Sequence, residues 1–268
     1  MNTRVFQKKI LDYYATHGRR FPWRNTRKPY NILVSEIMLQ QTQVSRVVPK
    51  YKLFLKTYPT IISLAQAELK DVLTLWQGLG YNRRAKLLHD TAKLVTKKYS
   101  GKLPRDRTEL ESLPGIGAYT AGAICVFAYN QSSVMIETNI RSVFLHFFFK
   151  NKESVSDTDV FKFIQKTVDT DNPRQWYYAL MDYGSMLKKT GNPNIKSKHY
   201  LRQSSFKGSD RHIRGLILRI LLQCKDPITK TALTKELIEY DKERILSQLT
   251  LLQNEGLTKS LRGRVSVA

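Results

Sequence analysis

The alternation of apolar and polar positions predicts helices along most of the chain. Apolar side chains recur at helical spacing over residues 4–16, 43–57, 68–76 and 83–98, and again over 138–149, 155–168 and 173–188. Residues 32–39 read ILVSEIML and are apolar on every side except for Ser35 and Glu36. A helix that is apolar all round is buried, so we expect Glu36 to be desolvated. The pattern as a whole predicts a mainly helical chain.

The last sixty residues follow a different pattern. Three helices are expected over 210–223, 230–239 and 241–254, followed by a short hairpin that turns at Arg262-Gly263-Arg264. Three helices and a basic hairpin are typical of a winged helix, a variant of the DNA-binding helix-turn-helix class. We therefore expect residues 206–268 to form a winged-helix-like DNA-binding module. The alternative is a small module that joins proteins.

Composition narrows the class of partner. The 268 residues contain 45 Lys and Arg against 22 Asp and Glu, a formal charge of +23. Such an excess favours a polyanionic partner, nucleic acid first and an anionic membrane surface second. No apolar run approaches the ~18 residues of a spanning helix, and a secretory leader is not evident. The two cysteines, Cys125 and Cys224, argue against a disulfide framework or a cysteine metal cluster and indicate a reducing, intracellular compartment.

A glycine-rich turn is the first candidate for a binding site. Residues 113–117 read Leu-Pro-Gly-Ile-Gly and separate a short helix beginning near Thr108 from a helix rich in small residues. The amides of such a turn, with the positive end of the second helix, can bind one phosphate. From these residues alone, an ordinary αα-hairpin with a Pro-Gly turn is equally possible. Glu137 follows about twenty residues later, either as a carboxylate placed for chemistry or as one favoured by the dipole of the helix over 138–149.

Three further polar features are candidates for function. Desolvation raises the pKa of a carboxyl, so a buried Glu36 suits a general acid, although local hydrogen bonds are the plainer explanation. The amides of Gln40-Gln41-Thr42-Gln43 can pair with base edges or fill a space left in a duplex, or form a solvated helix end. A second glycine-punctuated turn, Gly78-Leu79-Gly80-Tyr81-Asn82, carries an aromatic side chain at its tip.

Taken together, six ordered segments resemble one family. They are FPWR (21–24), PYNILVSEIMLQQTQV (29–44), LWQGLGYNRRAKLLH (75–89), LPGIGAYTAGAI (113–124), IETNIRSV (136–143) and ALMDYGSM (179–186). This set resembles the helix-hairpin-helix DNA glycosylases, and in particular the MutY-type adenine glycosylases, over roughly residues 5–190. The resemblance implies an all-α, two-lobed helix-hairpin-helix fold with DNA and a flipped base bound between the lobes. The expected domains are 1–20 with 131–205, a six-helix domain at 21–130 that carries the hairpin, and the module at 206–268.

The resemblance also implies a reaction and roles. A base-excision-repair glycosylase would hydrolyse the N-glycosidic bond of a flipped adenine mispaired with 8-oxoguanine or guanine. Glu36 would protonate the leaving purine, while Glu137, supported by Asn139, would stabilise the positive sugar and assist attack by water. Tyr119 stands where lyase-type relatives have a Schiff-base lysine, so the reaction should stop at the abasic site. The expected DNA-binding residues are Arg24, Gln40, Gln41, Thr42, Tyr81, Asn82, Arg83, Arg84, Gly115 and Gly117.

Three departures from the family pattern matter. The family has aspartate where this chain has Glu137, and one added methylene moves a carboxylate by ~1.5 Å, where a misplacement of about 1 Å can cost ~100-fold in rate. Either the backbone compensates or the enzyme is slow or inactive. The four cysteines that usually hold an iron–sulfur cluster are absent from 188–203, so we expect no cluster, no other metal and no cofactor. The usual C-terminal domain that inspects oxidised guanine is replaced by the winged helix.

Two other functions stay open. Tyr119 and the FPWRNTRKPY opening also resemble thymine glycosylases that act on G·T mismatches, whereas Gln40-Gln41 and the Ser35-Glu36 pair follow the adenine branch. A lesion-binding protein that does not cleave is the third possibility. In each case the expected partner is double-stranded DNA that contains a mispair or lesion, bound by a monomer without a membrane. The expected location is the cytoplasm, with nucleoid association if the protein is bacterial.

Overall fold

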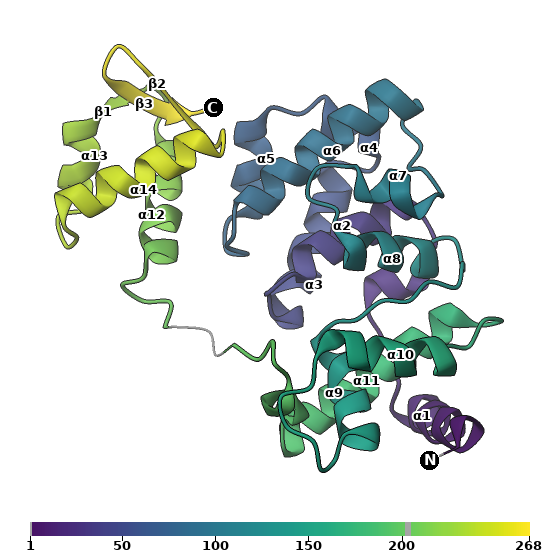
Figure 1. Cartoon of the computed structure of the whole chain (residues 1–268). Helices are drawn as coiled ribbons and strands as arrows, with labels where there is room; N and C mark the ends of the chain where they lie inside the picture. The colour runs from purple at the N-terminus through teal and green to yellow at the C-terminus, as the bar shows by residue number, and fades with distance from the viewer. Residues whose placement is uncertain (1, 202–204) are drawn as a thin grey trace. The chain divides into compact units, whose positions relative to one another are not determined.

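The computed structural model describes residues 2–201 and 205–268, and it is helical apart from one small sheet (Figure 1). Residues 202–204 of the expected 131–205 domain lie outside the described residues. From the N-terminus the elements are α1 (Thr3–His17), the 3₁₀ turn η1 (Pro22–Asn25), α2 (Pro29–Leu39), α3 (Val44–Thr57), α4 (Ile61–Ala65), α5 (Leu69–Trp76), α6 (Arg83–Tyr99), α7 (Arg107–Glu111), α8 (Ala118–Phe127), α9 (Thr138–Phe148), α10 (Asp157–Thr167), α11 (Pro173–Thr190), the 3₁₀ turn η2 (Pro193–Lys196), α12 (Asp210–Gln223), β1 (Ile228–Thr229), α13 (Lys230–Glu236), α14 (Lys242–Asn254), β2 (Thr258–Leu261) and β3 (Arg264–Val267).

The long helices lie where hydrophobic periodicity predicted them, within a few residues at each end. The periodicity did not predict α4, which is only 5 residues long. A helix of this length presents less than two turns of apolar side chains. A capping box starts it, because the amide of Ser63 donates to Thr60 Oγ1 at 3.0 Å and the amide of Thr60 donates to Ser63 Oγ at 3.1 Å.

The chain packs into two compact units. The first comprises Met1–Leu33, Pro104–Ser112 and Ile116–Arg202, and the second comprises Val34–Leu103, Leu113–Gly115 and Gln203–Ala268. The sequence instead placed 21–130 in one domain and 206–268 in a module of its own, and that three-part division stays a prediction. Among the described residues, no helix combines the length and the apolar character that crossing a membrane requires.

The first unit is built around aromatic side chains from α1, α9 and α11. Phe6 is fully buried, and its ring lies edge-on to Phe144 and Trp176, at centroid distances of 5.5 and 5.6 Å. Helices α9 and α11 pack along each other, and α10 lies beside α9 (Figure 1). Aromatic pairs of this kind contribute about 0.5–1.5 kcal/mol each beyond the area they bury. In α9 this core contains Phe144, in the half of the helix that lies farther from Glu137.

The second unit buries apolar side chains from α2, α3 and α5. Trp76 of α5 is fully buried and packs edge-on against Phe54 of α3, with ring centroids 6.2 Å apart. Residues 34–38 of α2 are all buried, Val34, Ile37 and Met38 among them, and Leu39 at the end of the helix is half-buried. The expected burial of this helix is therefore confirmed, and with it the burial of Glu36 between apolar neighbours.

The C-terminal part of the second unit consists of three helices and a small sheet. Helices α12, α13 and α14 contact an antiparallel sheet of order β1-β3-β2 (Figure 1). Strands β2 and β3 form the expected hairpin, with Thr258 opposite Val267 and Leu261 opposite Arg264. The expected three helices and hairpin are confirmed. β1 is an addition that periodicity could not indicate, because it is 2 residues long.

Candidate functional site

Glu137 is the N-cap residue of α9. Its backbone is extended, with φ −141° and ψ 177°, and its Oε1 accepts a hydrogen bond of 3.0 Å from the amide of Ile140. Asn139 Nδ2 donates to the other carboxylate oxygen, Oε2, at 3.1 Å. Aspartate, asparagine, serine and threonine are the usual side chains in this position. Here the longer glutamate still reaches the capping position, so the extra methylene does not detach the carboxylate from the helix end.

The surroundings of Glu137 act on its charge in opposite directions. Burial raises the pKa of the Glu137 carboxyl above its ordinary value. Hydrogen bonds from Asn139 and Ile140 and the positive charge of Lys188 oppose this effect and favour the ionised form. Lys188 is exposed on α11, one helical turn after Gly184. The result is a half-buried carboxylate that is fixed by donors on two sides.

Tyr119 lies in the first turn of α8, in the same unit as Glu137. Its side chain is half-buried. The turn that contains it reads Ala118-Tyr119-Thr120, so this position offers a phenol and not an amine. Asn139, the other expected auxiliary residue, contacts Glu137 directly as described above.

Glu36, the second expected catalytic carboxyl, lies near the C-terminal end of α2. Its residue is 7% exposed, and the flanking residues Ser35 and Ile37 are buried as well. Glu36 belongs to the second unit, whereas Glu137 belongs to the first. That the two carboxyls share one pocket therefore stays a prediction.

The glycine-rich turn joins α7 to α8. Gly115 has a φ of +72°, and a Cβ at this residue would lie 2.8 Å from Leu87 Cβ. Thr91 Oγ1 donates to the carbonyl of Pro114 at 2.5 Å, which ties the turn to α6. Gly117 has ordinary backbone angles and is the N-cap residue of α8. Because glycine has no side chain, it leaves the first amides of the helix without a side-chain cap. The first amides of α8 therefore stand at an exposed helix end, the arrangement that binds a phosphate.

We expect Gly115→Ala to weaken DNA binding about tenfold or more and to lower thermal stability. The substitution would place a side chain in left-handed backbone, which costs of order 1–3 kcal/mol, and against Leu87, so the turn must shift. Fluorescence anisotropy with a labelled duplex measures the affinity. The matched control is Gly191→Ala, because Gly191 has a φ of 176° and a Cβ there would meet nothing within 4 Å. Equal affinities for the Gly115 and Gly191 variants would contradict the assignment of the turn.

Two other turns carry Gln41 and Tyr81, which are among the expected DNA-binding residues. Gln41 has a φ of +51° and Tyr81 of +47°, and both are exposed, Tyr81 by 37%. Both line a hollow of about 1110 Å³, together with Gln40, Asn82 and Arg83. Arg211 of α12 lines the same hollow and donates from Nη1 to the Tyr81 hydroxyl at 2.8 Å. Sequence reasoning missed Arg211, since a contact across 130 residues leaves no local signal.

Arg84, an expected DNA-binding residue, is buried and makes hydrogen bonds inside the protein, and its contact with DNA stays a prediction. It is 8% exposed, and Nη1 donates to the carbonyls of Ile37, Met38 and Gln40 at 2.7, 3.0 and 2.5 Å. Nη2 donates to Thr42 Oγ1 and to the carbonyl of Gly80, both at 3.0 Å. Burial lowers the pKa of Arg84 to about 10, so the side chain stays charged at neutral pH. Arg84 therefore joins the end of α2 to the Gly78–Asn82 turn. It also donates a hydrogen bond to the Thr42 hydroxyl.

Arg24 is also used inside the protein and not at its surface. Its Nη1 and Nη2 donate to the two carboxylate oxygens of Asp182, each at 2.8 Å, and Arg19 Nε donates to Asp182 Oδ1 at 2.6 Å. The guanidinium also stacks on Tyr178, 4.4 Å from the ring centroid. The two arginines hold the pKa of Asp182 below its ordinary value, although burial alone would raise it. The FPWR segment therefore ties the N-terminal part of the chain to α11.

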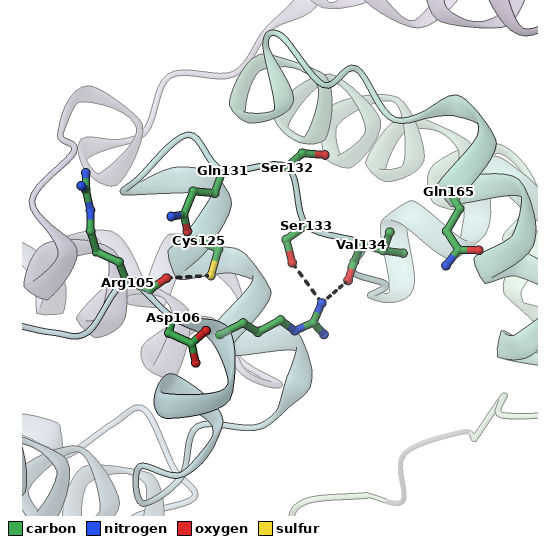
Figure 2. Close-up of a pocket in the computed structure, with 9 residues that line it drawn as sticks. Arg105, Asp106, Cys125, Gln131, Ser132, Ser133, Val134 and Gln165 are labelled. Atoms are coloured by element: carbon green, nitrogen blue, oxygen red, sulfur yellow. Dashed lines mark hydrogen bonds between the residues drawn. The ribbon is translucent and has the colours of Figure 1, made fainter.

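A second hollow, of about 580 Å³, lies beside the segment that leads to Glu137 (Figure 2). Arg107 Nη1 donates to Ser133 Oγ at 3.0 Å and to the carbonyl of Val134 at 3.1 Å, which fixes this segment to α7. Cys125 lies in its wall with Sγ 3.9 Å from the carbonyl of Arg105. Burial raises the pKa of the Cys125 thiol, so the sulfur stays protonated at neutral pH.

The donor set of this chain does not fit an iron–sulfur cluster. Such a cluster is held by four thiolates, whereas the sequence contains two cysteines, and these belong to different units. Within the described ranges, 2–201 and 205–268, no group of three or more histidine, cysteine or carboxylate side chains is placed to bind a metal ion.

The hairpin, the helical fold and the capped carboxylate define a helix-hairpin-helix protein, and comparison with known proteins places it further. A family model described as HhH-GPD superfamily base excision DNA repair protein matches residues 34–239. Because this match covers most of the 268 residues, the chain belongs to that superfamily.

Named relatives and a solved structure agree with the family. An adenine DNA glycosylase of Buchnera aphidicola is 37% identical over 229 residues, which cover 80% of this chain and 64% of that protein. The chain thus spans a little under two thirds of that relative. An adenine DNA glycosylase of Mycolicibacterium smegmatis is 31% identical over 97% of this chain and 95% of its own length. The structure of a thermostable thymine-DNA glycosylase superimposes with a TM-score of 0.64 at 28% identity, over 69% of this chain and 86% of that one.

Proposed function

We propose that the protein is a monofunctional DNA glycosylase that removes adenine mispaired with 8-oxoguanine or guanine. The observation that carries the proposal is the Glu137 carboxylate, which is held at the N-cap of α9 by Ile140 and Asn139. The names of the relatives from Buchnera aphidicola and Mycolicibacterium smegmatis support adenine as the base.

The proposed chemistry divides the work between two carboxyls. The nucleotide is first extruded from the duplex, because its glycosidic bond is out of reach inside the stack. Glu36, buried among apolar side chains, protonates the purine so that it leaves as a neutral base. Glu137 is ionised, stabilises the positive charge that develops on the sugar, and assists water in its attack on the anomeric carbon.

The DNA interface proposed for this reaction uses three turns. The exposed start of α8 after Gly117 binds one phosphate of the backbone. Gln41 and Tyr81, both at the tips of left-handed turns, enter the duplex and take the space that the extruded nucleotide leaves. The net charge of +23 supplies attraction that does not depend on sequence.

The products follow from the residues present. Tyr119 offers a phenol that forms no Schiff base, so the proposed reaction ends at an abasic site with the strand intact. The carboxyls supply the acid and the stabilising charge themselves, and we propose that the protein needs neither a cluster nor another cofactor. It would act as a cytoplasmic monomer, associated with the nucleoid if the protein is bacterial.

A second candidate function is removal of thymine from G·T mismatches. The specific observation in its favour is the structural likeness to a thymine-DNA glycosylase at 28% identity. Tyr119 and the FPWRNTRKPY opening favour it too, whereas Gln40-Gln41 and Ser35-Glu36 favour adenine.

Single-turnover assays on a panel of duplexes test the proposal. Adenine should be released from A opposite 8-oxoguanine and from A·G, and the strand should break only after alkaline treatment. Release of thymine from G·T, with adenine duplexes left intact, would replace the adenine assignment with the second candidate. If no duplex loses a base while mispaired DNA still binds tightly, the protein is a lesion-binding protein and the proposed reaction is wrong.

A further inference from the structure

The segment that follows α11 buries two polar residues, Asn194 and Ser197, among more accessible ones. We call residues 192–198 the strap. Asn192 starts it in left-handed backbone, with a φ of +35°, and η2 follows directly. Asn194 is only 3% exposed, whereas the next residue, Ile195, is 64% exposed. A buried amide in a surface segment costs free energy unless it makes hydrogen bonds, so the partners of Asn194 show what the strap contacts.

Those partners lie in the first two turns of α9. Asn194 Nδ2 donates to the carbonyl of Thr138 at 3.0 Å and also to Ser142 Oγ. Ser142 Oγ in turn donates to the same Thr138 carbonyl at 2.8 Å. A carbonyl only accepts, so the NH₂ group of Asn194 must face Thr138 and its orientation is fixed. Thr138 is the residue directly after Glu137, and the strap thus holds the helix end that carries the carboxylate.

Helix α11 holds the same turn from another side. A Cβ at Gly184 would lie 2.0 Å from the carbonyl oxygen of Asn139, so only glycine permits this approach of the two backbones. Asn139 is the residue whose side chain donates to Glu137. The turn from Glu137 to Asn139 is therefore fixed by α11 at Asn139 and by the strap at Thr138.

The strap is itself anchored to the unit. The amide of Val155 donates to the carbonyl of Lys196 at 2.8 Å, and the amide of Lys198 donates back to the carbonyl of Val155 at 3.0 Å. Within the strap, the amide of Ser197 donates to the carbonyl of Asn194 at 2.9 Å. The backbone that carries the Asn194 side chain is therefore hydrogen-bonded to Val155 as well. These bonds limit how far Asn194 can move from α9.

We propose that Asn194 is a positioning residue for Glu137, and that the strap, in the stretch of sequence where a cluster-binding segment would lie, fixes the first turn of α9 with hydrogen bonds. The inference rests on the proposed function for its consequence in catalysis. A carboxylate that stabilises a developing charge must be held within a fraction of an ångström of its place, and displacement of about 1 Å can cost ~100-fold in rate. Loss of the Asn194 amide removes one of the two supports of that turn.

The test compares Asn194→Ala and Asn194→Asp with Thr167→Ala. The aspartate variant keeps the size of the side chain but sets a carboxylate oxygen against the Thr138 carbonyl. Thr167 is a matched control because it is buried in the same unit and its hydroxyl donates to backbone carbonyls of its own helix, α10, at 2.8 and 3.4 Å. Single-turnover base release should fall about 10- to 100-fold in Asn194→Ala, and further in Asn194→Asp. Affinity for a mispaired duplex and the fall in melting temperature should match those of Thr167→Ala.

A second measurement does not depend on catalysis. Hydrogen exchange of the Ile140 amide, the donor to Glu137, should become at least fivefold faster in both Asn194 variants and stay unchanged in Thr167→Ala. Unchanged exchange in the Asn194 variants, or a loss of rate no greater than that of Thr167→Ala, would overturn the inference. If the wild type releases no base but the exchange effect is present, the proposed reaction fails while the support of the Glu137 turn by Asn194 stands.

Discussion

Replacing Glu137 with glutamine is expected to slow base release by about 10³-fold and to leave the affinity for a mispaired duplex within about threefold of wild type. The amide keeps the shape of the side chain and an oxygen that can accept the hydrogen bond from Ile140. It removes the negative charge that would stabilise the sugar cation, and loss of such electrostatic stabilisation costs about 10²–10³-fold in comparable sites. The measurement is the single-turnover rate on A opposite 8-oxoguanine, with binding measured in parallel.

The same substitution should have a stability effect of the opposite sign. Burial raises the pKa of Glu137 above the ordinary 4.5, so folding favours the protonated carboxyl and the ionised form destabilises the protein. Wild-type stability is therefore lost as pH rises from the ordinary carboxyl pKa through the raised one. Glutamine mimics the protonated form, so Glu137→Gln should be the more stable protein at neutral pH. The difference in the free energy of unfolding should be about 1.4 kcal/mol for every tenfold increase that folding causes in the proton affinity of the Glu137 carboxylate. Urea unfolding of the two proteins across a pH series measures the difference, which should disappear as pH falls below the ordinary value.

Glu137→Asp separates charge from position. Aspartate is favoured at an N-cap and keeps the charge, so this variant should retain base release within about 100-fold of wild type. A Glu137→Gln protein that cleaves as fast as wild type would exclude this carboxylate from the reaction. If neither wild type nor Glu137→Asp releases a base from any duplex, the result favours a lesion-binding protein and contradicts the proposed glycosylase.

Replacing Glu36 with glutamine is expected to reduce base release by about 10²–10⁴-fold, the usual contribution of a general acid. Glu36 lies in a helix that is buried on every side, and glutamine has nearly the same shape, so the fold should survive. Single-turnover base release measures the loss, which is expected because glutamine has no proton to give. The acid side of the wild-type pH–rate profile should reflect Glu137, which must lose its proton to act.

A core substitution in the same helix provides the control for Glu36. Met38 is buried in α2, and Met38→Leu conserves volume, so it should disturb the packing of the helix as much as glutamine does and leave the rate within about threefold. An equal loss of rate in Met38→Leu and Glu36→Gln would mean that the helix tolerates no change, and the role of Glu36 as an acid would lose its support.

Hydrophobic periodicity predicted the long helices because each buries one continuous stripe, as α6 and α12 do. It predicted Glu36 as buried for a different reason, because residues 32–39 are apolar on nearly every side. The internal partners of Arg24 and Arg84 could not be predicted, since a basic side chain in such a segment is as consistent with DNA binding as with a bond to an internal carboxylate or carbonyl. Only the folded chain shows that Asp182 and the end of α2 use these charges.

The contacts that hold the Glu137 turn in place could not be predicted from the sequence, for a different reason. Asn194 contacts a residue 56 positions earlier, and Gly184 is required by one backbone oxygen of α9. Neither contact has a local pattern, because asparagine and glycine are common in loops and at helix ends. The added methylene of Glu137 could be noticed in the sequence, but its accommodation at the N-cap depends on the position of Ile140 and Asn139.

The internal use of arginines has a consequence for how tightly this protein can hold a polyanion. Arg24 and Arg141 pair with carboxylates, Arg84 binds backbone carbonyls around a turn, and Arg174 donates to the carbonyls of Arg24 and Thr26. Such side chains displace no condensed counterions when a duplex arrives, because their donors are already occupied. The dependence of binding on ionic strength should therefore reflect fewer phosphate contacts than the 45 Lys and Arg residues suggest.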